Sequence, residues 1–340
     1  MSPMFTQHFV TIFTVSRTSS ENKTFKMGKI ALTSATGKLG SAVLNAILEN
    51  NLIDPSDLIV QTSSPLTSSK LQSLRAQNLT LRHADFDNPP SLSSAYAGCT
   101  SLFLVSSPRI AMDYHTSTLW HGREKHHRAA IDAALAVGVQ HIYYTSLAFA
   151  NPSKASVMRA HERTETYLKD LEARGRCSVT IVREGLYSES WPLYFGYYFG
   201  LGAERRSEVV VAGDGRVSWT AIADMGFATA KVLSEPGGKW KGKTFYLSQT
   251  RTWSLRDVAR MVSRVRGEEV VLKIVSRKAY EDFYICEQNM EKPSVEWWSS
   301  TYDALGDGEC AIEDDTLEAI LQEAGRKPTT LDETIQDMWK

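Results

Sequence analysis

The feature that most constrains the fold is a regular alternation of apolar runs and amphipathic stretches between residues 29 and 183. The apolar runs predict β-strands at residues 29–34, 57–60, 79–86, 101–107, 141–147 and 178–183. Helical spacing of apolar residues occurs between them, at residues 41–50, 123–138 and 158–175. Strands that alternate with helices form βαβ units with parallel strands and right-handed crossovers. The sequence therefore predicts an α/β fold with a Rossmann-type, doubly wound parallel sheet.

Composition narrows the class of protein further. The 340 residues include 38 Lys and Arg against 39 Asp and Glu, so no charge excess points to nucleic acid. No apolar run reaches the roughly 18–20 residues that a membrane span needs. The four cysteines are scattered, without metal-ligand spacing. We therefore expect a cytoplasmic protein with reduced thiols that binds neither membranes nor nucleic acid.

The sequence "ALTSATGKLGSAVL", residues 31–44, joins the first predicted strand to a helix through Ser34, Gly37 and Gly40. A helix N-terminus offers unpaired N–H groups and partial positive charge to an anion. The spacing is that of the loop that holds the pyrophosphate of a dinucleotide, with serine in place of the first glycine. Serine fits there if its φ is negative, whereas a positive φ costs roughly 1 kcal/mol or more. We expect the loop to bind the cofactor in either case.

The end of the second strand bears on the choice between NAD and NADP. An acidic residue there holds the ribose diol of NAD. This strand ends in Gln61, Thr62, Ser63 and Ser64, without a carboxylate. The hydroxyl groups, together with Lys38 and Lys70, favour NADP(H), with NAD(H) as the alternative. An uncommitted polar turn is the competing interpretation.

The regular alternation fades after Arg183. An aromatic stretch follows at residues 185–202, then a predicted helix at 257–267, a strand at 269–276 and a capped helix after Pro328. We expect residues 1–27 to be a disordered extension, although their Ser- and Thr-rich composition weakly resembles a transit peptide. Residues 28–150 are predicted to form the NAD(P)-binding domain, and residues 151–184 to continue its sheet. Residues 185–340 are predicted to form mainly a smaller α/β substrate lobe.

Several motifs together resemble one family. In chain order they are "ALTSATGKLG", "ADFDNPPSL", "HIYYTSLAFA", "AHERTETYL", "VREGLYSES", "AGDGRVSWTAIADMG" and "GRKPTTLDETI". Their order and content are similar to those of NmrA-like atypical short-chain dehydrogenases, in the branch of quinone oxidoreductase 2 and triphenylmethane reductase. The resemblance covers residues 28–337. It implies an NAD(P)H-dependent reductase.

The resemblance also implies which residues bind the cofactor. They lie in the glycine loop and at the ends of the predicted strands, and comprise Ser34, Thr36, Gly37, Lys38, Leu39, Gly40, Thr62, Ser63, Asp85, Phe86, Val105, Ser106, Ser107, Tyr144, Thr145, Ser146, His161, Glu184 and Gly185. Two further departures from the branch stand out. Ser63 occupies the place of an arginine that holds the 2′-phosphate, and Glu184 the place of an asparagine near the nicotinamide.

The chemistry implied is hydride transfer without the usual proton relay. Ordinary short-chain dehydrogenases use a Tyr-x-x-x-Lys pair, but Val157 stands four residues before His161, which occupies the place of the lysine. The reduction of a carbonyl requires protonation in the transition state, and without such a donor its rate would fall by about 10²–10⁴. A quinone or a cationic dye tolerates hydride addition without that proton. His161 is expected either to bind the ribose or to act as an acid.

The acceptor site is expected in the aromatic stretch. Tyr187 is predicted either to polarise an acceptor oxygen or simply to pack within the protein. The other aromatic residues are predicted to form either a stacking pocket for the acceptor or a packed core or oligomer contact: Trp191, Tyr194 and Phe195, with Tyr197, Tyr198 and Phe199 nearby. No metal site is expected, because His121, His126 and His127 cannot share one helix face.

Three functions compete at this point. The first is an NAD(P)H-dependent oxidoreductase of an aromatic, quinone-like acceptor, as a tailoring reductase in a biosynthetic pathway. The second is a dinucleotide-sensing regulatory protein without catalysis. The third is a carbonyl or imine reductase that uses His161 as acid. The aromatic stretch and Tyr187 favour an enzyme, and the sequence does not indicate an oligomeric state.

Overall fold

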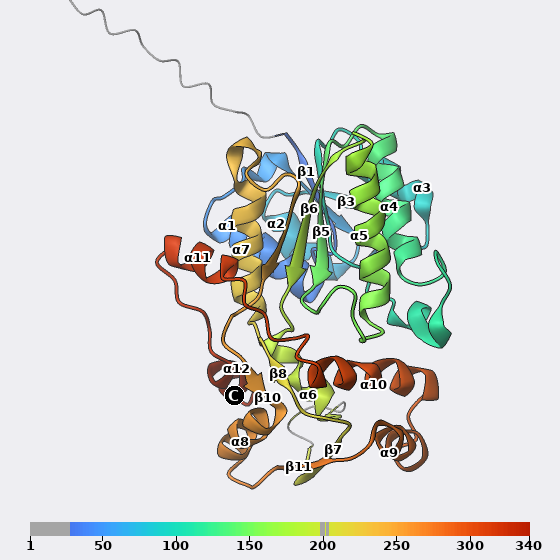
Figure 1. The fold of residues 1–340 in the computed structure, drawn as a ribbon. Helices are drawn as coiled ribbons and strands as arrows, with labels where there is room; N and C mark the ends of the chain where they lie inside the picture. Colours follow the sequence, from blue (N-terminus) through green and yellow to red (C-terminus); the bar gives the residue numbers. More distant parts are fainter. Residues whose placement is uncertain (1–27, 198–200, 202–203) are drawn as a thin grey trace, which may run out of the picture.

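The computed structural model describes residues 28–197, 201 and 204–340. The predicted disordered extension therefore lies outside the described residues, as do Tyr198 and Phe199. Two layered regions share the rest of the chain (Figure 1). The upper region in that view holds a parallel sheet between two helical layers, and the lower region is smaller and mostly helical.

The sheet has seven strands in the order β3-β2-β1-β4-β5-β6-β9, and every pair is parallel. The strands are β1 (Ile30–Leu32), β2 (Leu58–Thr62), β3 (Thr80–His83), β4 (Ser101–Leu104), β5 (His141–Leu147), β6 (Ser178–Glu184) and β9 (Lys243–Leu247). The order reverses between β1 and β4, which is the topological switch point where ligands bind in open α/β sheets. The predicted doubly wound fold is confirmed.

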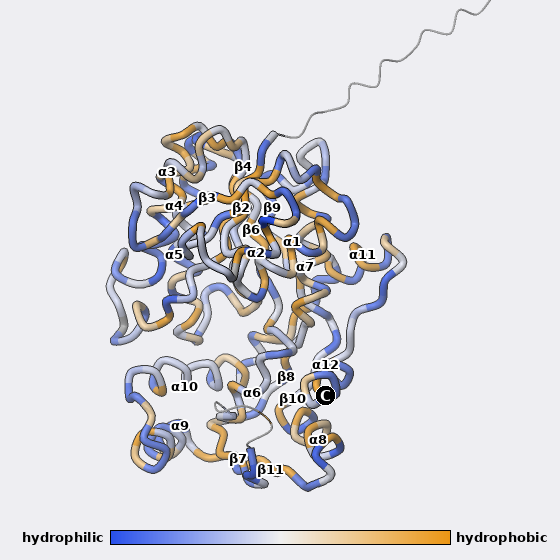
Figure 2. The backbone as a smooth tube through the Cα atoms, turned by 180° about the vertical axis from the view of Figure 1, so that it is seen from behind, coloured by the Kyte–Doolittle hydropathy of each residue, from blue (hydrophilic) through white to orange (hydrophobic). Residues whose placement is uncertain are grey.

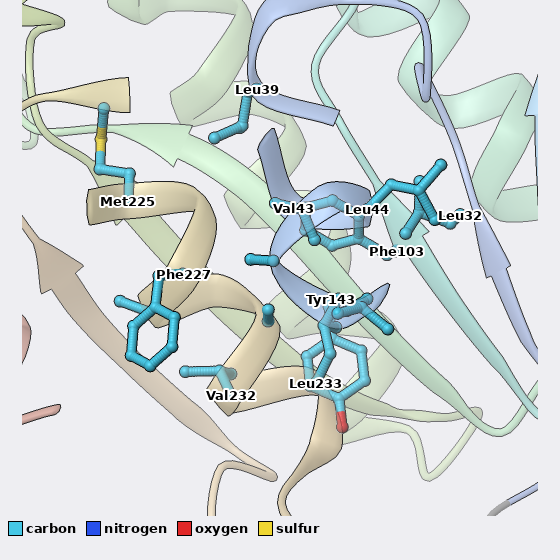
Figure 3. Close-up of a cluster of buried hydrophobic side chains, with 14 of the residues drawn as sticks. Leu32, Leu39, Val43, Leu44, Phe103, Tyr143, Met225, Phe227, Val232 and Leu233 are labelled. Atoms are coloured by element: carbon cyan, nitrogen blue, oxygen red, sulfur yellow. The ribbon is translucent and has the colours of Figure 1, made fainter. Parts of the chain in front are cut away.

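Helices cover both faces of the sheet because its strands are apolar on both sides. One face packs against α1 (Lys38–Glu49), α2 (Gln72–Ala76), α7 (Ile222–Ser234) and α11 (Thr316–Glu323). The other packs against α3 (Pro89–Tyr96), α4 (Glu124–Ala136) and α5 (Met158–Ala173). Figure 3 shows the first of these cores, in which Val43 and Leu44 of α1 meet Met225 and Leu233 of α7 and side chains of the strands.

The lower region has a core of its own, visible from behind in Figure 2. Its elements are α6 (Trp191–Tyr194), β7 (Glu208–Val211), β8 (Arg216–Val217), β10 (Trp253–Ser254), α8 (Leu255–Arg266), β11 (Val271–Ile274), α9 (Arg277–Asp282), α10 (Lys292–Gly306) and α12 (Leu331–Met338). β7 pairs with β11 in parallel, and β8 with β10 antiparallel. A capping box joins Thr330 and Glu333 at the start of α12, as the sequence pattern predicts.

The chain crosses between the two regions more than once after residue 185. α7 packs on α1, β9 extends the parallel sheet beside β6, and α11 packs on α7 and β9. The upper region thus contains three elements from residues 185–340, the segment predicted to form mainly the substrate lobe. Within the described part of the chain, no helix is both long and apolar enough to cross a membrane.

Candidate active site

The glycine loop at the switch point is built around a strained serine. Ser34 has φ of 55°, so the positive-φ alternative applies and the backbone pays the cost of a left-handed residue with a side chain. The Ser34 carbonyl accepts a hydrogen bond from the N–H of Gly37 (2.8 Å). A Cβ on Gly40 would lie 2.1 Å from that same carbonyl oxygen. Only glycine at position 40 lets the helix approach the turn this closely.

The N-terminus of α1 is suited to an anion. Gly37 is its N-cap residue and provides no side chain, so no side-chain acceptor satisfies the N–H groups of the first turn. The first turn contains no acidic residue, and Lys38 adds a positive charge. The unpaired N–H groups and the helix dipole therefore favour a phosphate at this point.

A polar cavity of ≈230 Å³ extends from this loop across the ends of β1, β2 and β3. Its walls include predicted cofactor residues Ser34, Thr36, Gly37, Thr62, Ser63, Asp85 and Phe86. They also include Thr33, Gln61, Ala84, Leu92, Tyr96, Pro108 and Arg109, which were not predicted as site residues. Arg109 is paired with the exposed Asp87. Its position two residues beyond Ser107, in the loop that follows β4, is the sequence signal that could have found it.

The hydroxyl groups at the ends of β4 and β5 are already engaged within the protein. Thr33 Oγ1 accepts a hydrogen bond from the N–H of Val105 (2.8 Å), and Thr145 Oγ1 accepts one from the N–H of Ser106 (3.0 Å). Ser146 Oγ donates to Glu165 (2.7 Å). Val105, Ser106, Thr145 and Ser146 are predicted cofactor residues, and these hydrogen bonds fix the strand ends. None of the four lines the polar cavity, whereas Thr33 does.

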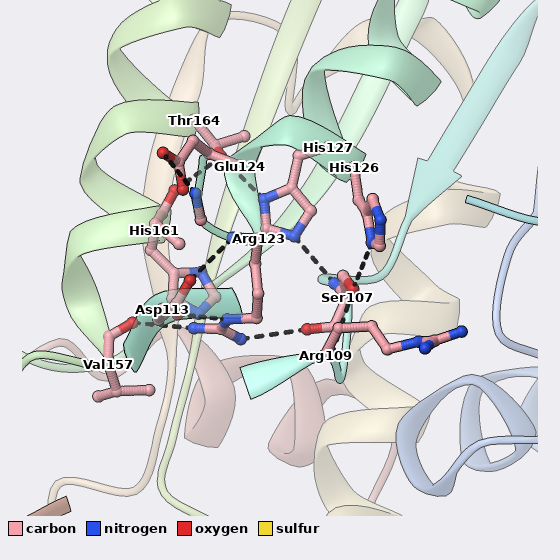
Figure 4. Close-up of polar contacts among 12 residues, drawn as sticks. Ser107, Arg109, Asp113, Arg123, Glu124, His126, His127, Val157, His161 and Thr164 are labelled. Carbon is pink, nitrogen blue, oxygen red and sulfur yellow. Dashed lines mark hydrogen bonds and ion pairs between the residues drawn. The ribbon is translucent and has the colours of Figure 1, made fainter. Parts of the chain in front are cut away.

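A buried polar network contains His127 of α4 and His161 of α5 (Figure 4), together with Tyr144 of β5. The N–H of Ser107 donates to Nε2 of His127 (2.9 Å), so that ring carries its proton on Nδ1, which lies 2.8 Å from Thr164 Oγ1. The hydroxyl of Tyr144 lies 3.0 Å from Nδ1 of His161. Burial lowers the pKa of His161 well below 6.5, and the charge of Arg123 lowers it further. His161 is therefore neutral near pH 7 and cannot serve as a cationic proton source.

Among the residues that the structure describes, no three or more His, Cys, Asp or Glu side chains come together in a way that could hold a metal ion. Of the three histidines considered in the sequence, His127 belongs to the buried network. His126 stacks on Phe86 with ring centroids 5.6 Å apart, and its Nε2 lies 3.2 Å from Asp87. His121 bonds locally to Thr118.

The end of β6 presents a buried acid. Arg183 forms an ion pair with Glu165 of α5 (2.7 Å), so Glu184 faces the opposite side of the sheet, which α1 and α7 cover. Glu184 is 2% exposed, and its Oε1 has no hydrogen-bond partner. Burial raises its pKa well above 4.5. Next to it, a Cβ on Gly185 would lie 2.4 Å from Thr220 Oγ1, so the backbone passes very close to its neighbour.

A second cavity, ≈140 Å³ in volume, lies below the end of β6. It is lined almost wholly by apolar and aromatic side chains: Leu147, Phe149, Val157, Leu186, Tyr187, Ser190, Leu193, Tyr194, Trp219, Trp298 and Thr301. Burial and the neighbouring Glu184 raise the pKa of Tyr187, so its hydroxyl is neutral. Tyr187 and Tyr194 thus lie where an acceptor pocket was predicted.

Two of the predicted acceptor residues lie elsewhere. Trp191 and Phe195 are fully buried and do not line this cavity. Trp191 stacks on Trp339, with centroids 5.6 Å apart and planes 11° from parallel. Both residues pack in the hydrophobic core of the lower region, which was the alternative considered for the aromatic stretch. Trp219 and Trp298 line the cavity instead, and neither was predicted as a site residue.

The fold, with the polar cavity at its switch point, defines a doubly wound α/β protein of the dinucleotide-binding class. Within that class the chain belongs to the NmrA-like family, whose model matches residues 26–335. It is 31% identical over 253 residues to quinone oxidoreductase 2 of Escherichia coli, covering 73% of this chain and 78% of the relative. The NmrA-like oxidoreductase flvB of Aspergillus flavus is 28% identical, over 74% of this chain and 76% of its own length.

Solved structures agree with this assignment. The NADP(H) complex of triphenylmethane reductase from Citrobacter sp. superposes with a TM-score of 0.73 at 28% identity, covering 91% of this chain and all of the other. The NADPH complex of the E. coli quinone oxidoreductase superposes with a TM-score of 0.75 at 27% identity, covering 92% of this chain and all of the other. The predicted family, branch and oxidoreductase class are confirmed.

Proposed function

We propose that the protein is an NADP(H)-dependent oxidoreductase that transfers hydride to a planar, quinone-like aromatic acceptor. The observation that carries the proposal is the apolar cavity beside the end of β6, because it adjoins the strand edge that would hold the nicotinamide. The similar triphenylmethane reductase and E. coli quinone oxidoreductase were solved as complexes with NADP(H) and NADPH, which supports this cofactor.

The residues of the switch point fit a dinucleotide. Gly40 leaves the space that a Cβ would fill, and Gly37 exposes the N–H groups of α1 to a pyrophosphate. The polar cavity beyond the loop would take the adenosine half, with Thr62 and Ser63 near the ribose and Asp85 and Phe86 near the base. Arg109 is the cation among the described side chains of this cavity, and we propose that it favours the 2′-phosphate in place of the arginine missing at Ser63.

The role of the protein in the reaction is to bind, orient and exclude water. When bound, the reduced nicotinamide supplies the hydride. A quinone that accepts it becomes a hydroquinone anion, which takes its proton from solvent. Tyr187 and the tryptophans hold the flat acceptor, and the neutral Tyr187 hydroxyl can donate a hydrogen bond to an acceptor oxygen. His161, joined to Tyr144 in the buried network, positions the cofactor-facing strand ends.

The neutral state of His161 weakens the case for a carbonyl or imine reductase that uses it as acid. The sensor without catalysis is the remaining competitor. The place of the reaction in a biosynthetic pathway and the cytoplasmic location stay predictions.

NADPH oxidation should be measured with a benzoquinone, a naphthoquinone, a cationic triarylmethane dye and an aliphatic ketone. We expect turnover with the planar acceptors and none with the ketone. Tyr187→Phe, which keeps the ring, separates hydrogen bonding from packing: a loss of about 10²-fold in kcat would assign the hydroxyl a chemical role. Cofactor binding without turnover of any acceptor would favour the sensor.

A further inference from the structure

Two buried side chains at the polar cavity have polar atoms without partners. Gln61 is 1% exposed, and neither its Oε1 nor its Nε2 makes a hydrogen bond. Tyr96 is fully buried, and its hydroxyl has no partner either. Both residues line the ≈230 Å³ cavity. Buried amide and hydroxyl groups are nearly always paired, so this pair of exceptions at one cavity requires an explanation.

Their placement follows from the elements that carry them. Leu58 and Val60 of β2 belong to the core on the α1 side, whereas Ile59 belongs to the core on the α3 side. Side chains alternate along a strand, so Gln61 faces α3 like Ile59. Tyr96 is the last residue of α3. Gln61 thus follows the apolar residues "LIV" in a strand that is buried throughout. An apolar side chain at this position would be buried at a lower cost in free energy than an unpaired amide.

We propose that Gln61, with Tyr96 beside it, recognises the adenine base of the cofactor. The inference rests on the proposed dinucleotide function and adds a specificity residue to it. A glutamine amide presents a donor and an acceptor side by side, and adenine presents the complementary pair, its amino group and a neighbouring ring nitrogen. The Tyr96 hydroxyl offers one further donor and acceptor at the same wall. Gln61 is therefore unpaired in the protein alone because the base completes its hydrogen bonds.

The chemistry separates adenine from hypoxanthine. Hypoxanthine has a carbonyl oxygen in place of the amino group, so on the N7 edge two acceptors, this oxygen and N7, would face the amide and only one could be satisfied. A site built to hydrogen-bond a group rejects the analogue that lacks it, because its own buried atoms then stay unpaired.

The test measures binding and needs no acceptor. NADPH and its hypoxanthine analogue are titrated by calorimetry into the full-length protein, Gln61→Met and Tyr96→Phe. We expect the unsubstituted protein to prefer the adenine form by about tenfold or more. Gln61→Met should reduce this preference to nearly one, and Tyr96→Phe should reduce it less. Equal binding of both dinucleotides by the unsubstituted protein, or an unchanged preference in Gln61→Met, would overturn the proposal.

Thermal unfolding without cofactor supplies a second arm. Gln61→Met removes two unpaired buried atoms, so its midpoint should equal or exceed that of the unsubstituted protein. The matched control is Gln249→Met, because the Gln249 amide is also buried but donates to the carbonyl of Thr329 (2.7 Å), and its loss should lower the midpoint. A fall in Gln61→Met as large as in Gln249→Met would show that Gln61 is structural. If neither dinucleotide binds to the unsubstituted protein, the result would instead count against the proposed function.

Discussion

The two cavities differ in the origin of their walls. The polar cavity is built from residues 33–109, which follow the first four strands of the sheet directly. The apolar cavity takes its walls from residues 147–301, across both regions of the molecule. The first is therefore set by local strand-to-helix connections that the fold repeats, and the second by long-range packing. The position of the polar cavity therefore follows from the fold, whereas that of the apolar cavity depends on how the lower region packs.

The largest expected effect concerns the polar cavity alone. Gly40→Ala places a Cβ 2.1 Å from the Ser34 carbonyl, so the turn and the helix must separate. We expect a loss of roughly 3 kcal/mol in the free energy of unfolding, together with weaker NADPH binding. Denaturant unfolding and calorimetry measure the two quantities. Gly306→Ala is the control, since no atom lies within 4 Å of its added Cβ, and it should fold normally. Unchanged NADPH affinity in Gly40→Ala would break the link between the glycine loop and the polar cavity.

The sequence predicts the polar cavity well for the same reason that Gly40 is sensitive. Gly37, Thr62 and Asp85 each follow a predicted strand, and parallel strands bring their carboxyl ends to one edge. Arg109 was missed because the predicted site residues stopped at Ser107, where the predicted strand ends, although the loop that follows β4 begins at the same edge of the sheet. For these residues of the polar cavity, a position directly after a predicted strand is enough to predict the site.

The apolar cavity could be predicted only in part. Tyr187 and Tyr194 lie in an aromatic stretch that the sequence marks, but density of aromatic residues does not tell which side of a short helix faces a cavity. Trp191 therefore packs on Trp339 instead. Trp219 and Trp298 lie far from that stretch, and only tertiary packing brings them to it.

A second prediction concerns Glu184, the buried acid at the end of β6. Its pKa is raised in the folded protein above 4.5, so its contribution to stability is fully present below that pH and is lost as pH rises through the folded pKa. Glu184→Gln removes the ionisation. Its stability relative to the unsubstituted protein should rise by about 1.4 kcal/mol for each pH unit between the two pKa values.

Chemical denaturation between pH 5 and pH 8 measures this difference for Glu184→Gln. Glu333→Gln is the control: hydrogen bonds from Thr330 lower the pKa of Glu333, so this carboxyl is ionised in both the folded and the unfolded state over this range, and its stability difference should not change with pH. A stability difference for Glu184→Gln that does not change with pH would show that Glu184 is not a buried neutral acid.

A third prediction tests the apolar cavity alone. Trp298 lines it and lies against Tyr194, with ring centroids 4.9 Å apart. Trp298→Leu removes this aromatic wall, so KM for a quinone should rise about tenfold, the loss expected for an aromatic contact and its buried area. NADPH affinity should stay unchanged. Steady-state kinetics and calorimetry give both values, and Trp253→Leu, which lies outside this cavity, serves as control. A parallel loss of NADPH affinity would mean that the two cavities are not separable.

The smallest effect returns to the turn that opens the polar cavity. Ser34→Gly relieves a φ of 55° that costs a residue with a side chain roughly 1 kcal/mol, but it also adds freedom to the unfolded chain, which costs about 0.5–1 kcal/mol. The net gain in stability should therefore be a few tenths of a kcal/mol at most. Asn51→Gly is the matched control, because Asn51 has φ of 51° and asparagine tolerates that conformation better, so its change should be smaller still. If Ser34→Gly instead weakens NADPH binding, the serine hydroxyl contributes to the phosphate site, and the polar cavity depends on more than the backbone N–H groups of α1.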